Sequence, residues 1–480
     1  MKLKQIVSQI DYATVIGNGE VEIKGIAIDS KQVRRGQIFI ALRGINTDGN
    51  DYIAEAIMRG AVAVVSEVTI VDLPVTLVVV NDARSSLAKI CSAYYCHPEK
   101  SLKFIGVTGT NGKTTVTHLI KGILDKNGYK TGLIGTLGAY YGDNYSETSL
   151  TTPDPIELFS TLSDMVSAGV THVIMEVSAH ASRLKKLDGI TFDIGVFTNL
   201  TQDHLDYFET IENYKQAKLE FLNLNKCKQI VTNVDDETGK EIALSTKSIS
   251  YGVDNPSDVF AINIEESKNG LKFVVNLFDY VLKVETKLIG YFNVYNVMSA
   301  LIASVMVGVS PQDAVNAIKG LERINGRLES LPSKNGVSVF IDYAHTPDGL
   351  SVSLKALRKI TPNKLFCVFG CGGNRDTSKR AVMGEISGLN ADFTVITSDN
   401  PRFEEPMDII ADVEKGIRKA TKKYVIIQKR QDAVYYALSM AKKGDTVLIA
   451  GKGAEQYQDI LGIKHPYNDK DTVKTYYLEN

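Results

Sequence analysis

Residues 104–120 have the sequence FIGVTGTNGKTTVTHLI, and few folds can accommodate this stretch. It opens with apolar residues typical of a buried strand and then passes through a glycine-rich turn. After the turn, apolar residues return at helical spacing, at Val116, Leu119, Ile120, Ile123 and Leu124. A strand, a glycine turn and a helix in this order form a phosphate-binding loop, because backbone N–H groups at a helix N-terminus attract anions.

The Gly112-Lys113-Thr114 ending supports a nucleotide site, although Val107 stands where the common pattern places a glycine. Lys113 would supply a point charge for the β- and γ-phosphates, and the Thr114 hydroxyl would ligate Mg²⁺. We therefore expect the nucleotide to contact the loop and the first turn of the helix, at Gly109, Thr110, Asn111, Gly112, Lys113, Thr114 and Thr115.

Composition limits the remaining possibilities. A chain of 480 residues exceeds a single core and predicts two to four domains. The net charge of −2, with basic residues spread along the chain, predicts no nucleic-acid partner. Five scattered cysteines without a CxxC pair argue against a disulfide framework. The absence of a signal-type segment or of an apolar run near 18 residues predicts a cytoplasmic protein without a membrane partner.

Short apolar runs alternate with helix-length segments in three blocks, which predicts an α/β protein with mostly parallel sheets. The expected domains are residues 1–98, 99–330 and 331–480. The expected strands lie in GQIFIAL, AVAVVSE, VTLVVVND, KFIGV, HVIMEV, DIGVF, KQIVTNV, GVSVFID, KLFCVF, ADFTVIT and DTVLIA.

An ordered series of motifs then identifies a family. The motifs are TGTNGKTT, TTPDP, MEVSAH, FTNLTQDHLDY, NVDDE, GYFNVYN, DYAHTPD, SDNPR and GKGAE, and AIDSKQVRRGQIFIALRG precedes them at residues 27–44. In this order they resemble the Mur ligase family, and within it the MurE-type ligases that add the third residue of the peptidoglycan stem peptide. The resemblance covers nearly the whole chain. It implies a uridine-nucleotide-binding domain, a central ATP-binding P-loop domain and a Rossmann-like C-terminal domain.

The resemblance also implies the reaction. ATP would phosphorylate the free carboxylate of UDP-N-acetylmuramoyl-L-alanyl-D-glutamate, and the amine of meso-diaminopimelate would displace phosphate from the acyl phosphate. The expected cofactors are ATP, Mg²⁺ and CO₂, the last carried as a lysine carbamate. The expected partners are these small molecules alone, the protein acting as a monomer in cytoplasmic peptidoglycan precursor synthesis.

By resemblance, Glu176, His204 and Lys218 join Thr114 as Mg²⁺ ligands, and with Lys113 these three form the catalytic set. Lys218 would act as a carbamate, because an ammonium cannot ligate Mg²⁺ whereas a carbamate presents anionic oxygens. Such a lysine needs a lowered pKa and hence a buried or cation-flanked position. Asp203 and Asp206 beside His204 are interpreted as a solvated helix start.

The remaining expected contacts also follow from the resemblance. Further ATP contacts are Asn293, Asn296, Arg327, Asp342 and His345, and contacts to the uridine substrate are Ser30, Thr151, Thr152, Ser178 and Lys186. Contacts to diaminopimelate are Arg375, Asp399, Asn400, Pro401, Arg402, Gly451 and Glu455. Arg402 would select this amino acid, because its guanidinium matches the extra carboxylate that lysine lacks.

Some details depart from the family pattern, and some alternatives stay open. Ala179 and Ala454 replace polar residues of the family, and Lys186 stands where an arginine is usual, so Arg183 is a second candidate for that contact. Arg402 could instead be a surface residue paired with Glu404 or Glu405. Other functions to weigh are ligation of L-lysine or another diamino acid, a folylpolyglutamate-synthetase-like or cyanophycin-type ligase, and a P-loop switch or motor.

Overall fold

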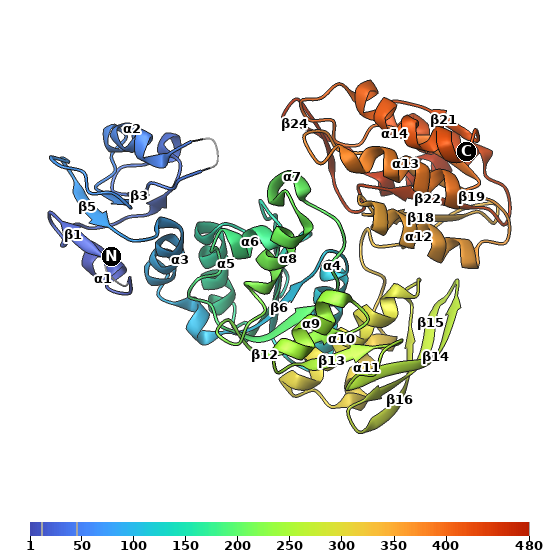
Figure 1. The fold of residues 1–480 in the computed structure, drawn as a ribbon, viewed down its shortest axis with the longest axis horizontal. Helices are drawn as coiled ribbons and strands as arrows, with labels where there is room; N and C mark the ends of the chain where they lie inside the picture. Colours follow the sequence, from blue (N-terminus) through green and yellow to red (C-terminus); the bar gives the residue numbers. More distant parts are fainter. Residues whose placement is uncertain (11–12, 45–46, 480) are drawn as a thin grey trace. The chain divides into compact units, whose positions relative to one another are not determined.

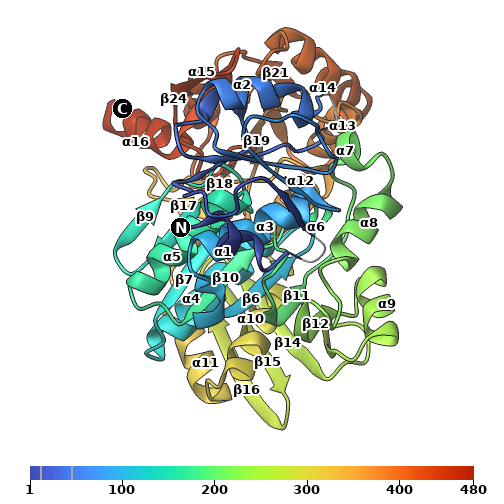
Figure 2. The same cartoon turned by 90° about the vertical axis from the view of Figure 1, so that its left-hand side faces the viewer.

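The computed structural model describes residues 1–10, 13–44 and 47–479 (Figures 1 and 2). The chain folds into two compact units that interleave along the sequence. Unit 1 comprises residues 1–108, 128–195 and 217–229, and unit 2 comprises residues 109–127, 196–216 and 230–480. In the described residues, no helix combines the length and the apolar character needed to cross a membrane.

The first sheet of unit 1 has the strand order β1-β5-β4-β3-β2 and is parallel except at the edge strand β1. Its core consists of buried residues such as Phe39, Val64 and Leu77, packed against apolar side chains of the α2 helix. Its elements are α1 (Leu3–Val7), β1 (Thr14–Ile16), β2 (Ile26–Ala27), β3 (Ile38–Ile40), α2 (Ile53–Met58), β4 (Ala63–Ser66), β5 (Thr76–Val79) and α3 (Ala83–Tyr94).

The second group of strands in unit 1 has the order β11-β6-β10-β7-β8-β9. The pairs β6–β10 and β10–β7 are parallel, and β7–β8 and β8–β9 are antiparallel hairpins. The elements are β6 (Lys103–Thr108), β7 (Thr131–Gly135), β8 (Gly138–Tyr141), β9 (Asn144–Ser146), α5 (Pro155–Ser167), β10 (His172–Glu176), α6 (Ala179–Arg183) and β11 (Phe192–Phe197).

Unit 2 contains the helix that follows the glycine loop, α4 (Lys113–Lys126), and its five predicted apolar residues are all buried. Strands β12 to β16 run in chain order, the last three as antiparallel neighbours. The other elements of this part are α7 (Leu205–Phe208), α8 (Ile211–Leu219), β12 (Cys227–Asn233), α9 (Glu237–Ser245), β13 (Ile249–Gly252), β14 (Val259–Ser267), β15 (Gly270–Leu277), β16 (Tyr280–Thr286), α10 (Phe292–Val307) and α11 (Pro311–Lys319).

The last sheet of unit 2 has the order β17-β18-β22-β19-β20-β21, parallel except for β17. Its strands and helices are β17 (Glu329–Leu331), β18 (Ser338–Asp342), α12 (Pro347–Ile360), β19 (Leu365–Phe369), α13 (Ser378–Asn390), β20 (Phe393–Ile396), α14 (Pro406–Ala420), β21 (Tyr424–Ile426), α15 (Arg430–Met440), β22 (Thr446–Ala450) and α16 (Asp469–Glu479). Strands β23 (Tyr457–Ile460) and β24 (Ile463–Pro466) form a separate antiparallel pair.

Helices cover both faces of this last sheet. Along β19, Cys367 and Phe369 pack on the side of α12, α13 and α14, whereas Phe366 and Val368 pack on the side of α15 and α16. Figure 2 shows α15 and α16 on one side of β19 and α13 and α14 on the other. Buried strands with crossover helices on both faces are typical of a doubly wound α/β fold, in which ligands bind at the carboxyl ends of the strands.

The predicted α/β class is confirmed, and each predicted strand segment contains a strand. The sheets with their helices agree with a three-domain architecture. The predicted boundaries after residues 98 and 330 do not coincide with the limits of the two compact units, and they stay a prediction.

A buried ion pair fixes the two helices on one face of the last sheet. Arg430 Nε and Nη2 donate to the two carboxylate oxygens of Asp469, both at 2.8 Å, and both side chains are completely buried. Arg430 Nη2 also donates to the carbonyl of Ala450, at 2.9 Å, so the pair joins α15, α16 and β22.

We expect Asp469→Asn to destabilise the protein by about 3 kcal/mol, because it leaves a buried guanidinium without its counter-charge. Lys470→Ala, at the neighbouring residue, is the matched control, because the Lys470 side chain is exposed where it pairs with Glu329. Loss of this pair should change the free energy of unfolding by less than about 1 kcal/mol. Urea unfolding midpoints of the two variants measure the difference. Equal midpoints would show that the buried pair does not stabilise the fold.

Candidate active site

The glycine loop at residues 109–112 is held by the segment that follows β11. Thr110 N donates to the Asn199 carbonyl at 2.8 Å, and Asn111 N donates to Asn199 Oδ1 at 2.9 Å. Thr198 Oγ1 donates in return to the Asn111 carbonyl, at 2.6 Å. The loop is therefore fixed through its backbone, and also through Thr110 Oγ1, which donates to the Thr201 carbonyl at 3.1 Å.

Two glycines are required in this loop. Gly109 and Gly112 have φ values of 144° and 88°, a region that favours glycine. A side chain at Gly109 would collide with Thr198 Oγ1, and one at Gly112 would collide with Asn296 Oδ1 on α10. The predicted strand–turn–helix context is present, and it places Asn296 beside the start of α4.

Lys113 is the first residue of α4, and its ammonium group lies against the loop. Its Nζ donates to the carbonyls of Gly109 and Thr110, both at 2.8 Å. The first N–H groups of a helix lack partners within the helix, and the helix dipole makes that end positive. Loop, lysine and helix N-terminus thus place positive charge where a nucleotide phosphate would bind.

Arg327, between α11 and β17, and Asp348, at the start of α12, contact the loop and the first turn of α4. Arg327 Nη2 donates to Thr114 Oγ1 at 2.9 Å, and its guanidinium lies 4.4 Å from the centre of the Tyr343 ring. Asn111 Nδ2 donates to Asp348 Oδ2 at 2.9 Å. The structure therefore brings Arg327 together with the loop, as predicted, and adds Asp348, which the sequence analysis missed.

The predicted ATP contacts Asn293, Asp342 and His345 are all hydrogen-bonded. Asn296 Nδ2 donates to Asn293 Oδ1 at 2.8 Å. Burial raises the pKa of the Asp342 carboxyl, which accepts from Leu328 N, Tyr343 N and Ser353 Oγ.

Burial also lowers the pKa of His345 to about 4, so its imidazole is neutral at pH 7. Its Nδ1 lies 2.8 Å from the Tyr343 carbonyl, which can only accept. Nδ1 therefore carries the proton, and Nε2 is left as an acceptor.

His204 precedes α7, and its backbone is left-handed, with φ of 55°. Its Nε2 lies 3.4 Å from Asp203 Oδ2. Burial raises the pKa of Asp203, but the nearby charges of His204, His345 and Lys379 outweigh burial and lower it overall. Asp203 is thus a half-buried carboxylate in a cationic setting, whereas Asp206 is exposed, as a solvated helix start requires.

In unit 1, Glu176 lies at the carboxyl end of β10, as predicted, and is 1% exposed. Thr136 donates to both of its oxygens, from the backbone N at 2.9 Å and from Oγ1 at 3.1 Å. Gly135 leaves room for this carboxylate, because a side chain there would collide with Glu176 Oε1. Thr136 also contacts the predicted substrate residue Thr151, Oγ1 to Oγ1 at 3.0 Å.

Three other predicted substrate residues form one hydrogen-bonded group. Thr152 Oγ1 donates to the Glu176 carbonyl at 2.8 Å and accepts from Ser178 N at 3.0 Å. Lys186 is buried, and its Nζ lies 3.4 Å from the Thr152 carbonyl and 2.8 Å from Asp154 Oδ1. Thr152, Ser178 and Lys186 therefore lie together beside Glu176.

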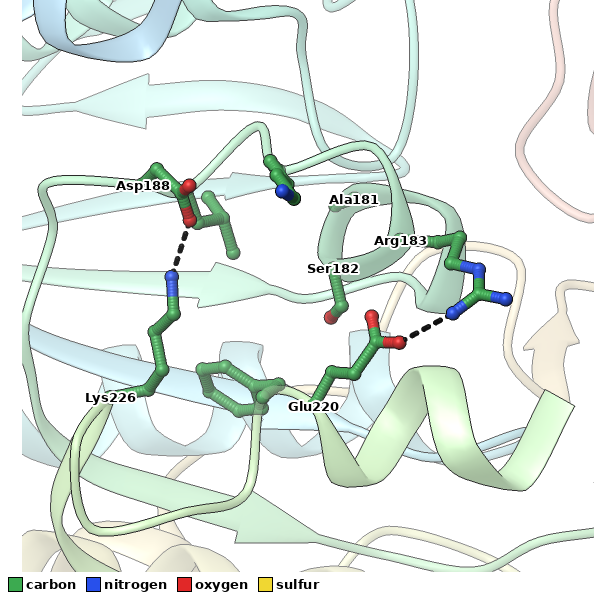
Figure 3. A pocket seen from close by; sticks show the side chains of 9 residues that line it. Ala181, Ser182, Arg183, Asp188, Glu220 and Lys226 are labelled. Carbon is green, nitrogen blue, oxygen red and sulfur yellow. Dashed lines mark hydrogen bonds and ion pairs between the residues drawn. The ribbon is translucent and has the colours of Figure 1, made fainter. Parts of the chain in front are cut away.

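The alternative candidate Arg183 lies elsewhere, at a pocket of about 440 Å³ (Figure 3). Its guanidinium pairs with Glu220 at 2.7 Å, and Lys226 pairs with Asp188 at 2.5 Å across the same pocket. Because Arg183 is exposed and already paired, the geometry favours Lys186 as the residue beside Thr152.

Two more predicted residues belong to unit 1, which includes the last three residues of α8, 217–219. Ser30 is buried, and its Oγ donates to Glu55 Oε2 on α2 at 2.6 Å. Lys218, in the last turn of α8, is 1% exposed, far from the surface position that its amphipathic sequence context would suggest. The burial that a carbamylated lysine requires is therefore present.

The predicted amino-acid pocket lies at the carboxyl ends of β20 and β22. Asp399 and Asn400 follow β20, and Gly451 follows β22 with φ of 112°. A side chain at Gly451 would crowd Asp399 Oδ2. Asn400 Nδ2 donates to Glu455 Oε2 at 2.9 Å, so these predicted residues lie together, with Pro401 buried beside them.

Arg402 extends over the glycine run that follows β19. Its Nη1 donates to the Gly373 carbonyl at 2.7 Å, and its Nε lies 3.9 Å from Asp459 Oδ2. Glu404, its alternative partner, instead accepts from Arg380 Nη2 with both oxygens, at 2.9 Å, and from Asn374 N. Arg375 is exposed in the loop between β19 and α13.

Within the described residues, no cluster of three or more His, Cys, Asp or Glu side chains is arranged to hold a metal. The four predicted Mg²⁺ ligands are not such a cluster, because two of them are the hydroxyl of Thr114 and a modified Lys218. Its carboxylate, hydroxyl and carbamate oxygens are nevertheless the donors that Mg²⁺ prefers, so the residues suit this ion.

The sequence analysis missed several polar residues that shape the site. Asn199 and Thr198 hold the glycine loop, Thr136 holds Glu176, and Lys452 lies buried between Asn400 and Glu455. Asn199 lies in FTNLTQDHLDY and Lys452 in GKGAE, so both motifs carried the signal. Thr136 lies outside the quoted motifs.

Comparison with known families places three domains along the chain. The Mur ligase family, catalytic domain, matches residues 22–95; the Mur ligase middle domain matches residues 107–304; and the Mur ligase, glutamate ligase domain, matches residues 326–453.

Full-length relatives are similar over the whole chain. A protein of Caldanaerobacter subterraneus subsp. tengcongensis is 41% identical, with 100% of both chains covered. One of Clostridium acetobutylicum is 40% identical, with 100% of this chain and 99% of the relative covered. Their names are UDP-N-acetylmuramoyl-L-alanyl-D-glutamate--2,6-diaminopimelate ligase, the second with the suffix 1.

Two solved structures are also similar. A structure with the same ligase name is 31% identical, with a TM-score of 0.70, and covers 100% of this chain and 99% of its own. A folylpolyglutamate synthase of Mycobacterium tuberculosis, 17% identical with a TM-score of 0.64, shares the fold over 76% of this chain and 92% of its own.

Proposed function

The chain belongs to the Mur ligase family and is an ATP-dependent ligase, and on that premise we propose that it joins meso-diaminopimelate to UDP-N-acetylmuramoyl-L-alanyl-D-glutamate. The observation that carries the proposal is similarity along the full length to relatives with that name. The folylpolyglutamate synthase shares only 76% of this chain, and residues 22–95 match a Mur ligase domain, so the folylpolyglutamate alternative is disfavoured. We further propose that this reaction takes place in the cytoplasm, as a step of peptidoglycan precursor synthesis.

The first step makes an acyl phosphate. ATP binds with its phosphates at the glycine loop, where Lys113 and the N-terminus of α4 stabilise the charge that moves with the γ-phosphoryl group. Asn296 and Arg327 lie beside the loop, and neutral His345 offers Nε2 as a hydrogen-bond acceptor, so these residues support the nucleotide. A bound Mg²⁺, held by Thr114, Glu176, His204 and carbamylated Lys218, would neutralise the repulsion between the phosphates and the substrate carboxylate.

The muramyl substrate supplies that carboxylate from unit 1. Lys186 places a buried cation beside Thr152 and Ser178, and this arrangement supports their role at the anionic peptide end. Ser30, in the short 3-10 helix between β2 and β3, serves the uridine nucleotide, with Glu55 fixing its hydroxyl. No step requires a second copy of the chain, and we propose that the protein acts as a monomer.

The second step is attack by the amine of diaminopimelate on the acyl phosphate, which releases phosphate. The distal end of diaminopimelate carries an ammonium and a carboxylate, and lysine carries only the ammonium. Asp399 and Glu455 suit the ammonium, and Arg402 suits the carboxylate with its planar donor pair. Arg375, exposed at the adjacent loop, has room to reach the same carboxylate.

Lys113→Ala should lower kcat by about 10²- to 10³-fold or more, because it removes a charge that stabilises the transferred phosphoryl group. Lys121→Ala is the matched control, two turns later on α4, where the side chain pairs with Asp125 at 2.6 Å. Phosphate release and unfolding midpoints are measured for both variants. Retention of half the parent activity by Lys113→Ala would remove the loop lysine from the mechanism.

Lys218 should carry CO₂. With ¹³C-labelled bicarbonate and Mg²⁺, the parent should show a carbamate carbon signal that Lys218→Ala lacks, and the variant should lose most activity. Short carboxylates such as acetate should restore part of it by supplying oxygen ligands. Lys215→Ala, one turn earlier on α8, should keep both the signal and the activity. A parent without the signal under saturating bicarbonate and Mg²⁺ would contradict the assignment.

The amino-acid assignment is tested by kcat/KM for meso-diaminopimelate and for L-lysine. The parent should prefer diaminopimelate, and Arg402→Ala should reduce that preference by roughly 30- to 150-fold, the value of a lost charge-assisted pair of ~2–3 kcal/mol. Arg418→Ala is the control, because Arg418 is exposed and pairs with Glu414 on α14. A parent that prefers lysine would support the lysine-adding alternative, and an unchanged preference in Arg402→Ala would end its role as selector.

A further inference from the structure

Lys452 is a completely buried cation beside the amino-acid pocket. It follows Gly451 at the carboxyl end of β22, and its side chain has no exposed surface. Its Nζ donates to Asn400 Oδ1 and to Glu455 Oε2, both at 2.8 Å, and lies 3.9 Å from Asp399 Oδ1. One ammonium group therefore contacts the three polar side chains that are expected to receive the amino acid.

These contacts fix the orientation of the Asn400 amide. Its Oδ1 accepts from Lys452 Nζ and from Asp459 N at 3.0 Å, so oxygen must point toward Lys452. Its Nδ2 then points to Glu455 Oε2, at 2.9 Å. With the amide reversed, the Lys452 ammonium and the Asp459 N–H would both face the NH₂ group of Asn400, which cannot accept a hydrogen bond.

The same contacts fix Glu455. Lys452 and Asn400 both donate to Oε2, which restricts the carboxylate to one rotamer. Among the residues that the structure describes, none is found to hydrogen-bond Oε1, and the side chain is 22% exposed. Oε1 is therefore the oxygen of Glu455 that we assign to a ligand ammonium.

Asp399 is held between two buried cations. Its Oδ2 lies 3.7 Å from Arg430 Nη1, and its Oδ1 faces Lys452. Arg430 is paired with Asp469, so Lys452 is the cation that balances Asp399 and Glu455. One negative charge remains in excess in this group of five, a charge that an ammonium ligand would neutralise.

We propose that Lys452 is a positioning residue for amino-acid recognition, which holds Asn400 and Glu455 so that Asp399 and Glu455 present one excess negative charge to the ammonium at the distal end of the substrate. Lys452 does not touch the substrate, because it is completely buried beneath these side chains. The assignment rests on the proposed function for the nature of the substrate, and on the geometry for the role of the lysine.

The first test compares KM values. Lys452→Met keeps a long unbranched side chain, one atom shorter than lysine, and removes the charge. It should raise KM for the amino acid by about tenfold or more, the value of a hydrogen bond to a charged group. KM for ATP and for the muramyl substrate should change by less than about twofold. Lys422→Met, at an exposed lysine before β21, is the matched control. An equal rise in all three KM values, or none, would overturn the proposal.

A double-mutant cycle with Glu455→Gln completes the test. If Lys452 acts through Glu455, the two changes should raise KM together by clearly less than the product of their separate effects, and independent effects would contradict the proposal. Should Lys452→Met fail to fold, Lys452→Gln keeps a donor without the charge and gives the same comparison, and failure of both would overturn the assignment. All measurements use whichever diamino acid the parent ligates best. The substrate preference of the parent therefore tests the proposed substrate, and the variants separately test the role of Lys452.

Discussion

The nucleotide loop can form only because residues 109 and 112 have no side chains. A side chain at Gly109 would occupy the position of Thr198 Oγ1, and one at Gly112 would occupy that of Asn296 Oδ1. The loop is consequently packed against the segment after β11 and against α10, and the start of α4 is fixed in direction. Arg327 and Asp348 reach the same loop through Thr114 and Asn111, so the location of the phosphate site follows from this close backbone packing.

Two buried cations, Arg430 and Lys452, lie near the residues that are predicted to bind the amino acid, and they are compensated in different ways. Arg430 and Lys452 are completely buried, an unfavourable state for a charged group unless paired charges and hydrogen bonds compensate for the lost water. Asp469 compensates Arg430, whereas Lys452 is compensated by residues of the pocket itself. Removing charge from one pocket residue would therefore change the orientation and the charge of the others. This coupling makes Asp399, Asn400, Lys452 and Glu455 one connected group rather than a set of independent side chains.

The sequence predicted the strands and α4 because their signal is local. Apolar runs such as KLFCVF are buried on both faces, and the apolar residues of α4 recur at helical spacing. Resemblance to the Mur ligases supplied the candidate residues, and the structure shows several of them together, including Thr152 with Ser178 and Asn400 with Glu455.

Contacts between residues far apart in the sequence could not be predicted in this way. Arg430 and Asp469 are 39 positions apart, and each alone is typical of a solvated helix surface. The burial of Lys218 could likewise not be predicted from the sequence of α8, because this sequence is weakly amphipathic and contains several charged residues. A choice such as Lys186 over Arg183 depends on which side chain pairs with Glu220, and this is a property of the folded chain. Local pattern thus determines the elements, and tertiary packing determines which polar residues are buried.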